Sequence, residues 1–228
     1  MNKGYQLTSS HSKSSWAMID TVLLDMDGTL LDLHFDNYFW LNWLPKKLSE
    51  EKHLSLEAAE VLVDGLVQKY RGKMQWYCLD YWSESLGMDI PLLKRQIAHK
   101  IGLRPFVKEF LEGLKQQGKK VILLTNSHPA GVKLKLETVP IASFFDEVVS
   151  SHEFGLPKED AKFWPAFKNH LVFDQSKTLL IDDTESVLAA AKNFGIGFCW
   201  YVRQPDMAKV VKPIGQFPSF THFDEVMP

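Results

Sequence analysis

The sequence predicts an α/β protein in which a parallel sheet is interrupted once by a helical segment. Short apolar runs alternate with helical segments along most of the 228 residues, as in parallel strands that are joined by helices. One stretch, between Asp32 and Arg104, contains no convincing strand. Polar clusters follow four of the apolar runs, at the edge of the sheet where α/β proteins bind ligands.

The predicted strands are short runs of aliphatic and β-branched residues, which are typical of strands buried on both faces. Helices fill the gaps between them. Pro105 suits the first turn of a helix that ends before Gly118, and the segment DDTESVLAAAKNFG begins with capping acids and ends at Gly195. The predicted strands are Ile19–Leu24, Val121–Leu124, Glu147–Ser150, Thr178–Ile181 and Gly197–Val202.

The stretch without strands is predicted to be an inserted helical domain, because Leu, Ala, Glu and aromatic residues recur in it at helical spacing. We expect Pro45, Gly72 and Gly87 to separate its helices. Its candidate helices are Asn37–Trp43, Ser55–Tyr70, Gln75–Leu86 and Pro91–His99. The predicted division of the chain is a flexible leader over 1–15, an α/β core over 16–32 and 105–228, and the helical insert over 33–104.

Composition excludes several classes of partner. The net charge of −2, from 26 basic and 28 acidic residues, provides no field that would favour nucleic acid or an anionic membrane. The chain has two cysteines, Cys78 and Cys199, outside any CxxC pattern, and no apolar run near the roughly 20 residues that span a bilayer. The N-terminal segment lacks the apolar core of a secretory signal. We therefore expect a cytoplasmic protein and leave its oligomeric state open.

Four polar clusters are expected to meet at the carboxyl edge of the sheet. They are Asp25 with Asp27, Thr125 with Asn126, Lys158, and Asp182 with Asp183. Carboxylates that converge at one place repel each other and are costly to desolvate, so a bound cation is the simplest explanation. Oxygen ligands without a convergent His or Cys favour Mg²⁺ over Zn²⁺.

The two acids of the DMDG segment suit two roles in phosphoryl transfer. Asp25 can attack phosphorus as a carboxylate nucleophile and form an aspartyl-phosphate. Asp27 can protonate the leaving alkoxide and then deprotonate the attacking water. Gly28 permits a tight turn and close approach of the ligand. Thr125, Asn126 and Lys158 offer a hydroxyl, an amide and a positive charge to the oxygens of a transferring phosphoryl group.

Each motif alone also has an ordinary structural explanation. DxDG segments occur in calcium loops and Asx turns, and Lys158 could be a solvated surface lysine. Asp182 and Asp183 could cap the helix that begins near Thr184. The ordered appearance of all four clusters after successive strands is what favours a catalytic site.

The segments DMDGTLLD, LLTNS, GLPKED and IDDTES resemble, in order, the four motifs of the haloacid-dehalogenase-like phosphohydrolase superfamily. This resemblance implies a Rossmann-like parallel core, and the helical insert after the first motif is similar to the cap of that superfamily's first cap class. It also implies Asp25 as nucleophile, Asp27 as general acid and base, and Thr125 and Lys158 as phosphate-binding groups. The second acid, Asp27, favours phosphate esters over carbon–halogen bonds.

The same resemblance implies a magnesium site. Its ligands would be Asp25, Asp183 and the backbone carbonyl of Asp27, with Asp182 as the neighbouring outer acid. Residues 18–206 resemble more closely the bacterial purine 5′-nucleotidases that act on GMP and IMP. The chain departs from many relatives at Glu159, where they carry proline.

Substrate selection is expected in the insert, which is rich in aromatic residues that can stack on a purine. The candidate substrate-binding residues are Trp76, Tyr77 and Arg71, although several of the rings must form the core of the insert itself. The expected partner is a small phosphate ester such as a purine nucleoside monophosphate. A sugar-phosphate phosphatase or phosphomutase on the same scaffold is the alternative, and a non-catalytic binding protein is a more remote one.

Overall fold

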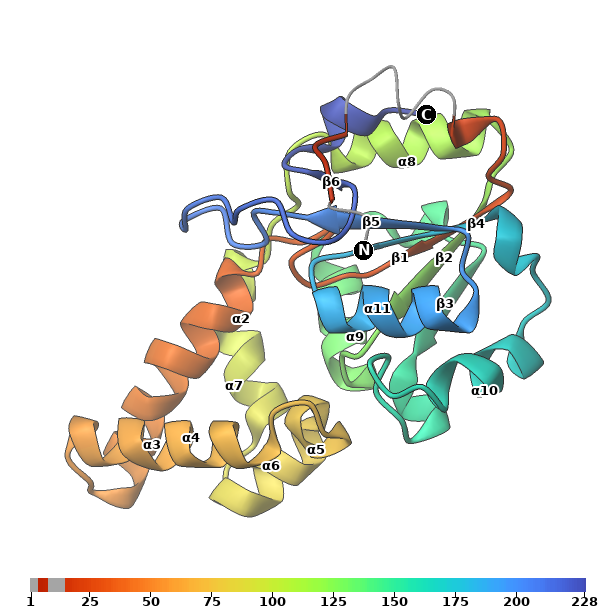
Figure 1. The fold of residues 1–228 in the computed structure, drawn as a ribbon. Helices are drawn as coiled ribbons and strands as arrows, with labels where there is room; N and C mark the ends of the chain where they lie inside the picture. The colour runs from red at the N-terminus through yellow and green to blue at the C-terminus, as the bar shows by residue number, and fades with distance from the viewer. Residues whose placement is uncertain (1–3, 8–14) are drawn as a thin grey trace.

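The computed structural model describes residues 4–7 and 15–228. Within these residues, six strands form one parallel sheet with the order β3-β2-β1-β4-β5-β6, which confirms the predicted α/β class (Figure 1). The strands are β1 (Thr21–Leu24), β2 (Lys120–Thr125), β3 (Glu147–Ser150), β4 (Thr178–Asp182), β5 (Phe198–Val202) and β6 (Ser219–Phe220). The first five correspond to the predicted strands, whereas β6 has only two residues and was not predicted.

The register of the central strands determines where the polar clusters lie. β1 is fully buried and pairs with β2 and β4, so that Leu24 lies beside Leu123 and Ile181. The residues that follow the three strands therefore leave the sheet at the same edge. Asp25, Thr125 and Asp182 emerge together for this reason.

Helices cover both faces of the sheet (Figure 1). Phe110 and Leu114 of α8 join the apolar cluster that contains Val22 and Leu24 of β1. On the opposite face, α10 and α11 pack in a second cluster with Leu23. The helical elements of this part are α8 (Val107–Gln116), α9 (Pro129–Thr138), η3 (Ala142–Phe144), η4 (Ser151–Phe154), α10 (Phe163–His170), η5 (Gln175–Lys177), α11 (Glu185–Phe194) and η6 (Phe223–Val226).

The chain between β1 and α8 is helical and lies beside the sheet, as Figure 1 shows at lower left. Its elements are α2 (His34–Tyr38), η1 (Phe39–Trp43), α3 (Leu44–Lys52), α4 (Leu56–Tyr70), α5 (Met74–Tyr77), α6 (Leu79–Leu86), α7 (Ile90–Gln96) and η2 (Ala98–Lys100). We call residues 33–104 the insert. Phe35, Phe39 and Trp82 are fully buried in it, so these rings form its core.

The expectation that Pro45 separates two helices was wrong. Helical structure continues from His34 to Lys52, and Pro45 lies in the first turn of α3. The π-helical turn η1 comes directly before it. Because proline has no N–H group and clashes with the carbonyl four residues earlier in a regular α-helix, a wider turn at this place accommodates it without ending the helix.

The described part of the N-terminal segment lies against the sheet. The backbone N–H of Leu7 donates to the carbonyl of Ser219 at 2.7 Å, and the N–H of Ser219 donates to the carbonyl of Tyr5 at 2.8 Å. Leu7 is buried. Most of the predicted flexible leader, residues 1–3 and 8–14, lies outside the described residues. Among the helices that are described, none is long and apolar enough to cross a membrane.

Candidate active site

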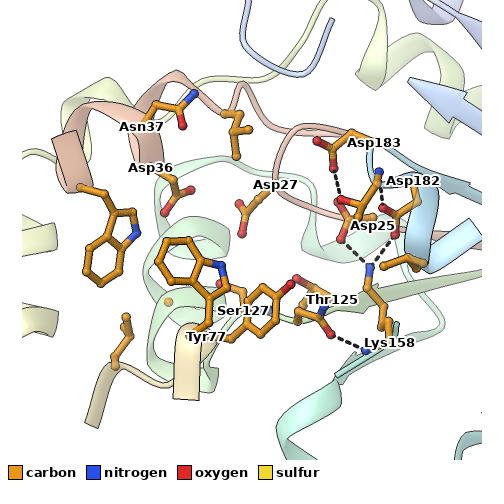
Figure 2. Close-up of a pocket in the computed structure, with 18 of the residues that line it drawn as sticks. Asp25, Asp27, Asp36, Asn37, Tyr77, Thr125, Ser127, Lys158, Asp182 and Asp183 are labelled. Atoms are coloured by element: carbon orange, nitrogen blue, oxygen red, sulfur yellow. Dashed lines mark hydrogen bonds and ion pairs between the residues drawn. The ribbon is translucent and has the colours of Figure 1, made fainter. Parts of the chain in front are cut away.

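A cavity of about 270 Å³ lies between the carboxyl edge of the sheet and the insert (Figure 2). The core contributes Asp25 after β1, Thr125 at the end of β2, and Asp182 with Asp183 at the end of β4. The insert contributes Trp40, Trp76 and Tyr77, among other residues. The structure thus brings the four predicted polar clusters to one place, although they are distant in the sequence.

Lys158 is buried at the base of this cavity and connects two of the acids. Its Nζ atom donates to Asp25 Oδ1 at 2.7 Å, to Asp182 Oδ2 at 2.8 Å and to the carbonyl of Leu124 at 2.9 Å. Burial alone would lower the pKa of Lys158, but Asp182 and Asp25 raise it above its ordinary value. Lys158 is therefore a permanent positive charge beside Asp25 (Figure 2).

Asn126 holds Lys158 in place. Its Oδ1 atom accepts the backbone N–H of Lys158 at 2.8 Å, and its Nδ2 atom donates to Glu159 Oε2 at 2.9 Å. Thr125 differs, because its Oγ1 accepts the N–H of Ser127 at 3.0 Å, which leaves the hydroxyl proton as a donor. This geometry suits Thr125 for a phosphate oxygen and suits Asn126 for positioning the lysine.

The carboxylates of Asp25, Asp182 and Asp183 form the candidate metal site, with one oxygen of each within 4.8 Å of the others. Asp25 Oδ2 is buried and has no hydrogen-bond partner among the described residues. Both oxygens of Asp182 are engaged, by Lys158 and by the backbone N–H of Thr184 at 2.9 Å. Asp182 is therefore less available to a divalent cation than Asp25, which has an unpartnered oxygen.

The charges of the site also favour a cation. Burial raises the pKa of Asp25 to about 6, in opposition to Lys158. Burial, Asp182 and Asp25 raise the pKa of Asp183 well above its ordinary value. These carboxylates are costly to ionise together, and Mg²⁺ would bind their ionised forms.

Gly28 allows the DMDG loop to approach Asp183. Its φ angle of +88° lies in the left-handed region, which side-chain-bearing residues rarely adopt. A Cβ atom at this position would lie 2.8 Å from Asp183 Oδ2 and 2.8 Å from Pro205 Cβ. Glycine is therefore required here for both conformation and space.

Asp27 belongs to a buried network that sequence reasoning missed. Lys135 of α9 donates to Asp27 Oδ1 at 2.6 Å and to Asp36 Oδ2 at 2.7 Å. Lys94 of α7 donates to Asp36 Oδ1 at 2.6 Å. The network links the sheet edge, α9 and two helices of the insert. Its sequence signal was available, because Lys135 lies three and four residues after Val132 and Gly131, on the buried face of α9.

The network sets the pKa of Asp27. Burial raises the pKa of Asp27 to about 6, Lys135 opposes this rise, and Asp36 adds to it. Burial would also raise the pKa of Asp36, but Lys135 and Lys94 hold it well below its usual range. Asp36 is therefore a fixed negative charge, whereas Asp27 can exchange a proton near neutral pH.

The candidate substrate-binding residues of the insert line two different cavities. Trp76 and Tyr77 line the active-site cavity, and Tyr77 donates its hydroxyl to Glu159 Oε1 at 2.8 Å. Arg71 lines a neighbouring cavity of about 470 Å³, which shares Trp40 and Trp76 with the first. Glu159, which sequence analysis noted only as a departure from relatives, thus joins the insert to the core.

Comparison with known proteins agrees with this geometry. A family model described as haloacid dehalogenase-like hydrolase matches residues 19–195. The chain is 40% identical over 218 residues to the GMP/IMP nucleotidase YrfG of Escherichia coli (strain K12), which covers 96% of this chain and 98% of that protein. It is 25% identical over 146 residues, or 62% of each chain, to the (S)-2-haloacid dehalogenase of Pseudomonas sp. (strain YL).

A solved structure shows the same fold. The HAD phosphatase from Thermococcus onnurineus matches with a TM-score of 0.73 at 20% sequence identity, over 89% of this chain and 94% of that one. The family resemblance that the sequence motifs indicate is therefore confirmed. Because the family model spans most of the chain and the relative from Escherichia coli is similar over nearly its full length, this chain belongs to the haloacid dehalogenase-like hydrolases.

Proposed function

We propose that this chain is a Mg²⁺-dependent phosphomonoesterase that hydrolyses purine nucleoside 5′-monophosphates, GMP and IMP above all. The observation that carries the proposal is a pair of acids that line one cavity: Asp25, which is buried and bonded to Lys158, and Asp27, which is partly buried and bonded to Lys135. The identity with a GMP/IMP nucleotidase over nearly the full length of both chains supports the choice of substrate. The cytoplasmic location expected from the sequence belongs to this proposal.

In the first step, a carboxylate oxygen of Asp25 attacks the phosphorus atom and an aspartyl-phosphate forms. The bond between phosphorus and the 5′-oxygen breaks, and Asp27 donates its proton to the leaving oxygen. Lys158 and the hydroxyl of Thr125 bind the phosphoryl oxygens, where negative charge is spread in the transition state. The product of this step is the free nucleoside.

In the second step, Asp27 is ionised and removes a proton from a water molecule. The water oxygen attacks phosphorus, the bond to Asp25 breaks, and inorganic phosphate leaves. A pKa near 6 suits Asp27 for both steps, because it can hold and release a proton close to neutral pH. Mg²⁺, held by Asp25, Asp183 and the carbonyl of Asp27, would neutralise charge on the phosphoryl group.

The insert supplies the groups that can distinguish one phosphate ester from another. Trp40 and Trp76 lie with their ring centroids 5.8 Å apart at an interplanar angle of 28°, and both line the cavity. Stacking of a base on such a ring contributes about 1–3 kcal/mol. Tyr77 lines the same cavity, and its hydroxyl donates to Glu159 of the core. A purine offers this wall more area than a pyrimidine.

The proposal is tested by kcat/KM for GMP, IMP, AMP, CMP and a small sugar phosphate, measured side by side with Mg²⁺. GMP and IMP share a 6-oxo group that can accept a hydrogen bond from a buried donor, and AMP lacks this group. A donor left unpaired by AMP costs about 1–3 kcal/mol, so kcat/KM for GMP and IMP should exceed kcat/KM for AMP by about five- to a hundredfold. Trp76→Ala should reduce the preference for purines. Tyr70→Ala, on a ring of the insert that packs on Tyr81 and lines neither cavity, is the control.

Two results would contradict the nucleotidase proposal. One is equal kcat/KM for AMP and GMP. The other is a sugar phosphate that reacts faster than every nucleotide, which would favour the sugar-phosphate alternative. Analysis of its products then separates a phosphatase, which releases inorganic phosphate, from a phosphomutase, which returns an isomerised sugar phosphate.

A further inference from the structure

A cluster of metal-binding side chains lies outside the carboxylate site. It consists of Cys78, His128 and His152, whose ligand atoms all lie within 4.8 Å of one another. Cys78 lies between α5 and α6 of the insert, His128 directly precedes α9, and His152 is in η4 after β3. The three residues come from separate segments, so no local sequence motif indicated them.

His152 has a ring nitrogen that lacks a partner. Its Nε2 atom is buried, and the residues that the structure describes offer it no hydrogen bond. Burial and the neighbouring His128 lower the pKa of His152 to about 4, so the ring is neutral at neutral pH. A neutral imidazole with an available nitrogen is the form that binds metal ions.

The other two side chains complete a donor set. The rings of His128 and His152 lie edge to face with their centroids 4.9 Å apart. Cys78 Sγ accepts the backbone N–H of Tyr81 at 3.5 Å, and its sulfur has further lone pairs for a metal. Asp80 Oδ2 lies 3.4 Å from His128 Nε2, so a carboxylate is also close. Thiolate sulfur and imidazole nitrogen are the donor atoms that Zn²⁺ prefers, whereas Mg²⁺ prefers oxygen.

We propose that Cys78, His128 and His152 form a binding site for Zn²⁺, with Asp80 or water as the fourth ligand. The site is separate from the carboxylate site and does not depend on the proposed reaction. Because Cys78 belongs to the insert and both histidines belong to the core, a bound ion would connect the insert to the core. Cys78 also follows Tyr77, so the ion would fix one wall of the active-site cavity.

The geometry sets an upper limit on the affinity. Ligand atoms around a tetrahedral zinc ion lie roughly 3.3–3.8 Å apart, so the separations within this cluster must shorten by up to about 1.5 Å. His128 Nδ1 accepts the backbone N–H of Ala130 at 3.3 Å, and this bond is lost whichever ring nitrogen binds zinc. The thiol must also release its proton to the solvent. We therefore expect Zn²⁺ to bind more weakly here than in structural zinc sites.

Cobalt provides the test, because Co²⁺ bound to a thiolate has a charge-transfer absorption that Co²⁺ bound only by oxygen and nitrogen lacks. The protein is saturated with Mg²⁺ and titrated with Co²⁺. We expect this absorption in the wild type and its loss when Zn²⁺ is added. The carboxylate site contains no sulfur, so Co²⁺ bound there cannot produce the signal, and the outcome is independent of the nucleotidase proposal.

Two cysteine variants locate the signal. Cys78→Ser should abolish the absorption, and serine keeps an acceptor for the N–H of Tyr81 at the start of α6. Cys199→Ala, which changes the buried cysteine of β5, should retain it. His152→Asn should weaken Zn²⁺ binding by at least tenfold in calorimetry, with unchanged circular dichroism. Absence of the absorption in the wild type, or its persistence in Cys78→Ser, would overturn the proposal.

Discussion

Replacement of Lys135 by methionine tests the network that holds Asp27. Lys135 is buried and is bonded to Asp27 and Asp36 at 2.6 and 2.7 Å. Methionine keeps much of the length of the side chain but removes the charge. Asp36 retains its bond to Lys94, whereas Asp27 loses its nearest positive charge. We therefore expect the change to act on the protonation of Asp27.

The size of the effect follows from the pKa of Asp27, which burial raises to about 6 while Lys135 is present. An opposite charge in direct contact lowers a carboxyl pKa by about one to three, so its removal should raise this pKa to about 7–9. At pH 7 the ionised fraction of Asp27 then falls roughly 2- to 90-fold. Hydrolysis of phosphorylated Asp25 needs ionised Asp27, so kcat should fall by the same factor.

Two assays use GMP. Rapid-mixing kinetics measures the release of guanosine in the first turnover, and steady-state kinetics measures kcat over a range of pH. Lys135→Met should release about one equivalent of guanosine in a burst and then turn over slowly, and the acid limb of its kcat profile should move up by about one to three pH units. Lys135→Arg, which keeps the charge, should restore most of the rate.

Lys133→Met is the matched control, because Lys133 lies on the exposed face of the same helix and pairs with exposed Glu137 at 3.9 Å. It should behave as the wild type. An unchanged kcat and pH profile in Lys135→Met would refute the assignment of Lys135 as the group that sets the protonation of Asp27.

Two further predictions concern the metal site. Burial raises the pKa of both Asp25 and Asp27 from 3.8 to about 6, so the folded protein holds these protons more tightly than the unfolded chain does. The metal-free protein should therefore lose stability as pH rises from about 4 to about 6. Because Mg²⁺ binds the ionised carboxylates, it should raise Tm more near pH 7.5 than near pH 5. An equal shift of Tm at both pH values would contradict this account. Gly28→Ala should lower the free energy of unfolding by about 1–3 kcal/mol and weaken Mg²⁺ binding. Gly72→Ala is the control, because Gly72 has a φ of +75° and no described neighbour lies within 4 Å of the new Cβ. It measures how much a side chain at positive φ lowers the free energy of unfolding. An equal decrease in both variants would exclude a contribution from the contact with Asp183.

The sequence predicts the elements whose signals are local. Strand β1 and its DMDG turn were found because an apolar run leads directly into acids and a glycine. The convergence of the polar clusters could also be predicted, since the carboxyl ends of neighbouring parallel strands lie at one edge. Strand β6 could not, because two residues carry no periodicity and its pairing depends on β5 and on the distant residues 4–7.

The parts of the site that were missed depend on contacts between distant segments. Lys135 and Asp36 are 99 positions apart in the sequence, yet they share a hydrogen bond. The bond between Tyr77 and Glu159 joins residues 82 positions apart. A lone lysine or glutamate has an ordinary surface interpretation until the fold places it beside a buried partner. Tertiary packing therefore decides these roles.

The central claim is that Asp25 is the nucleophile of a phosphomonoesterase, and phosphate release from GMP by purified Asp25→Asn tests it most directly. The amide is a poor nucleophile, so the rate with Mg²⁺ should fall about 10³-fold or more, while Lys158 keeps its bond to Asp182 and circular dichroism stays unchanged. Mass spectrometry excludes deamidation back to aspartate. Phosphate release at the wild-type rate by intact Asp25→Asn would contradict the covalent mechanism.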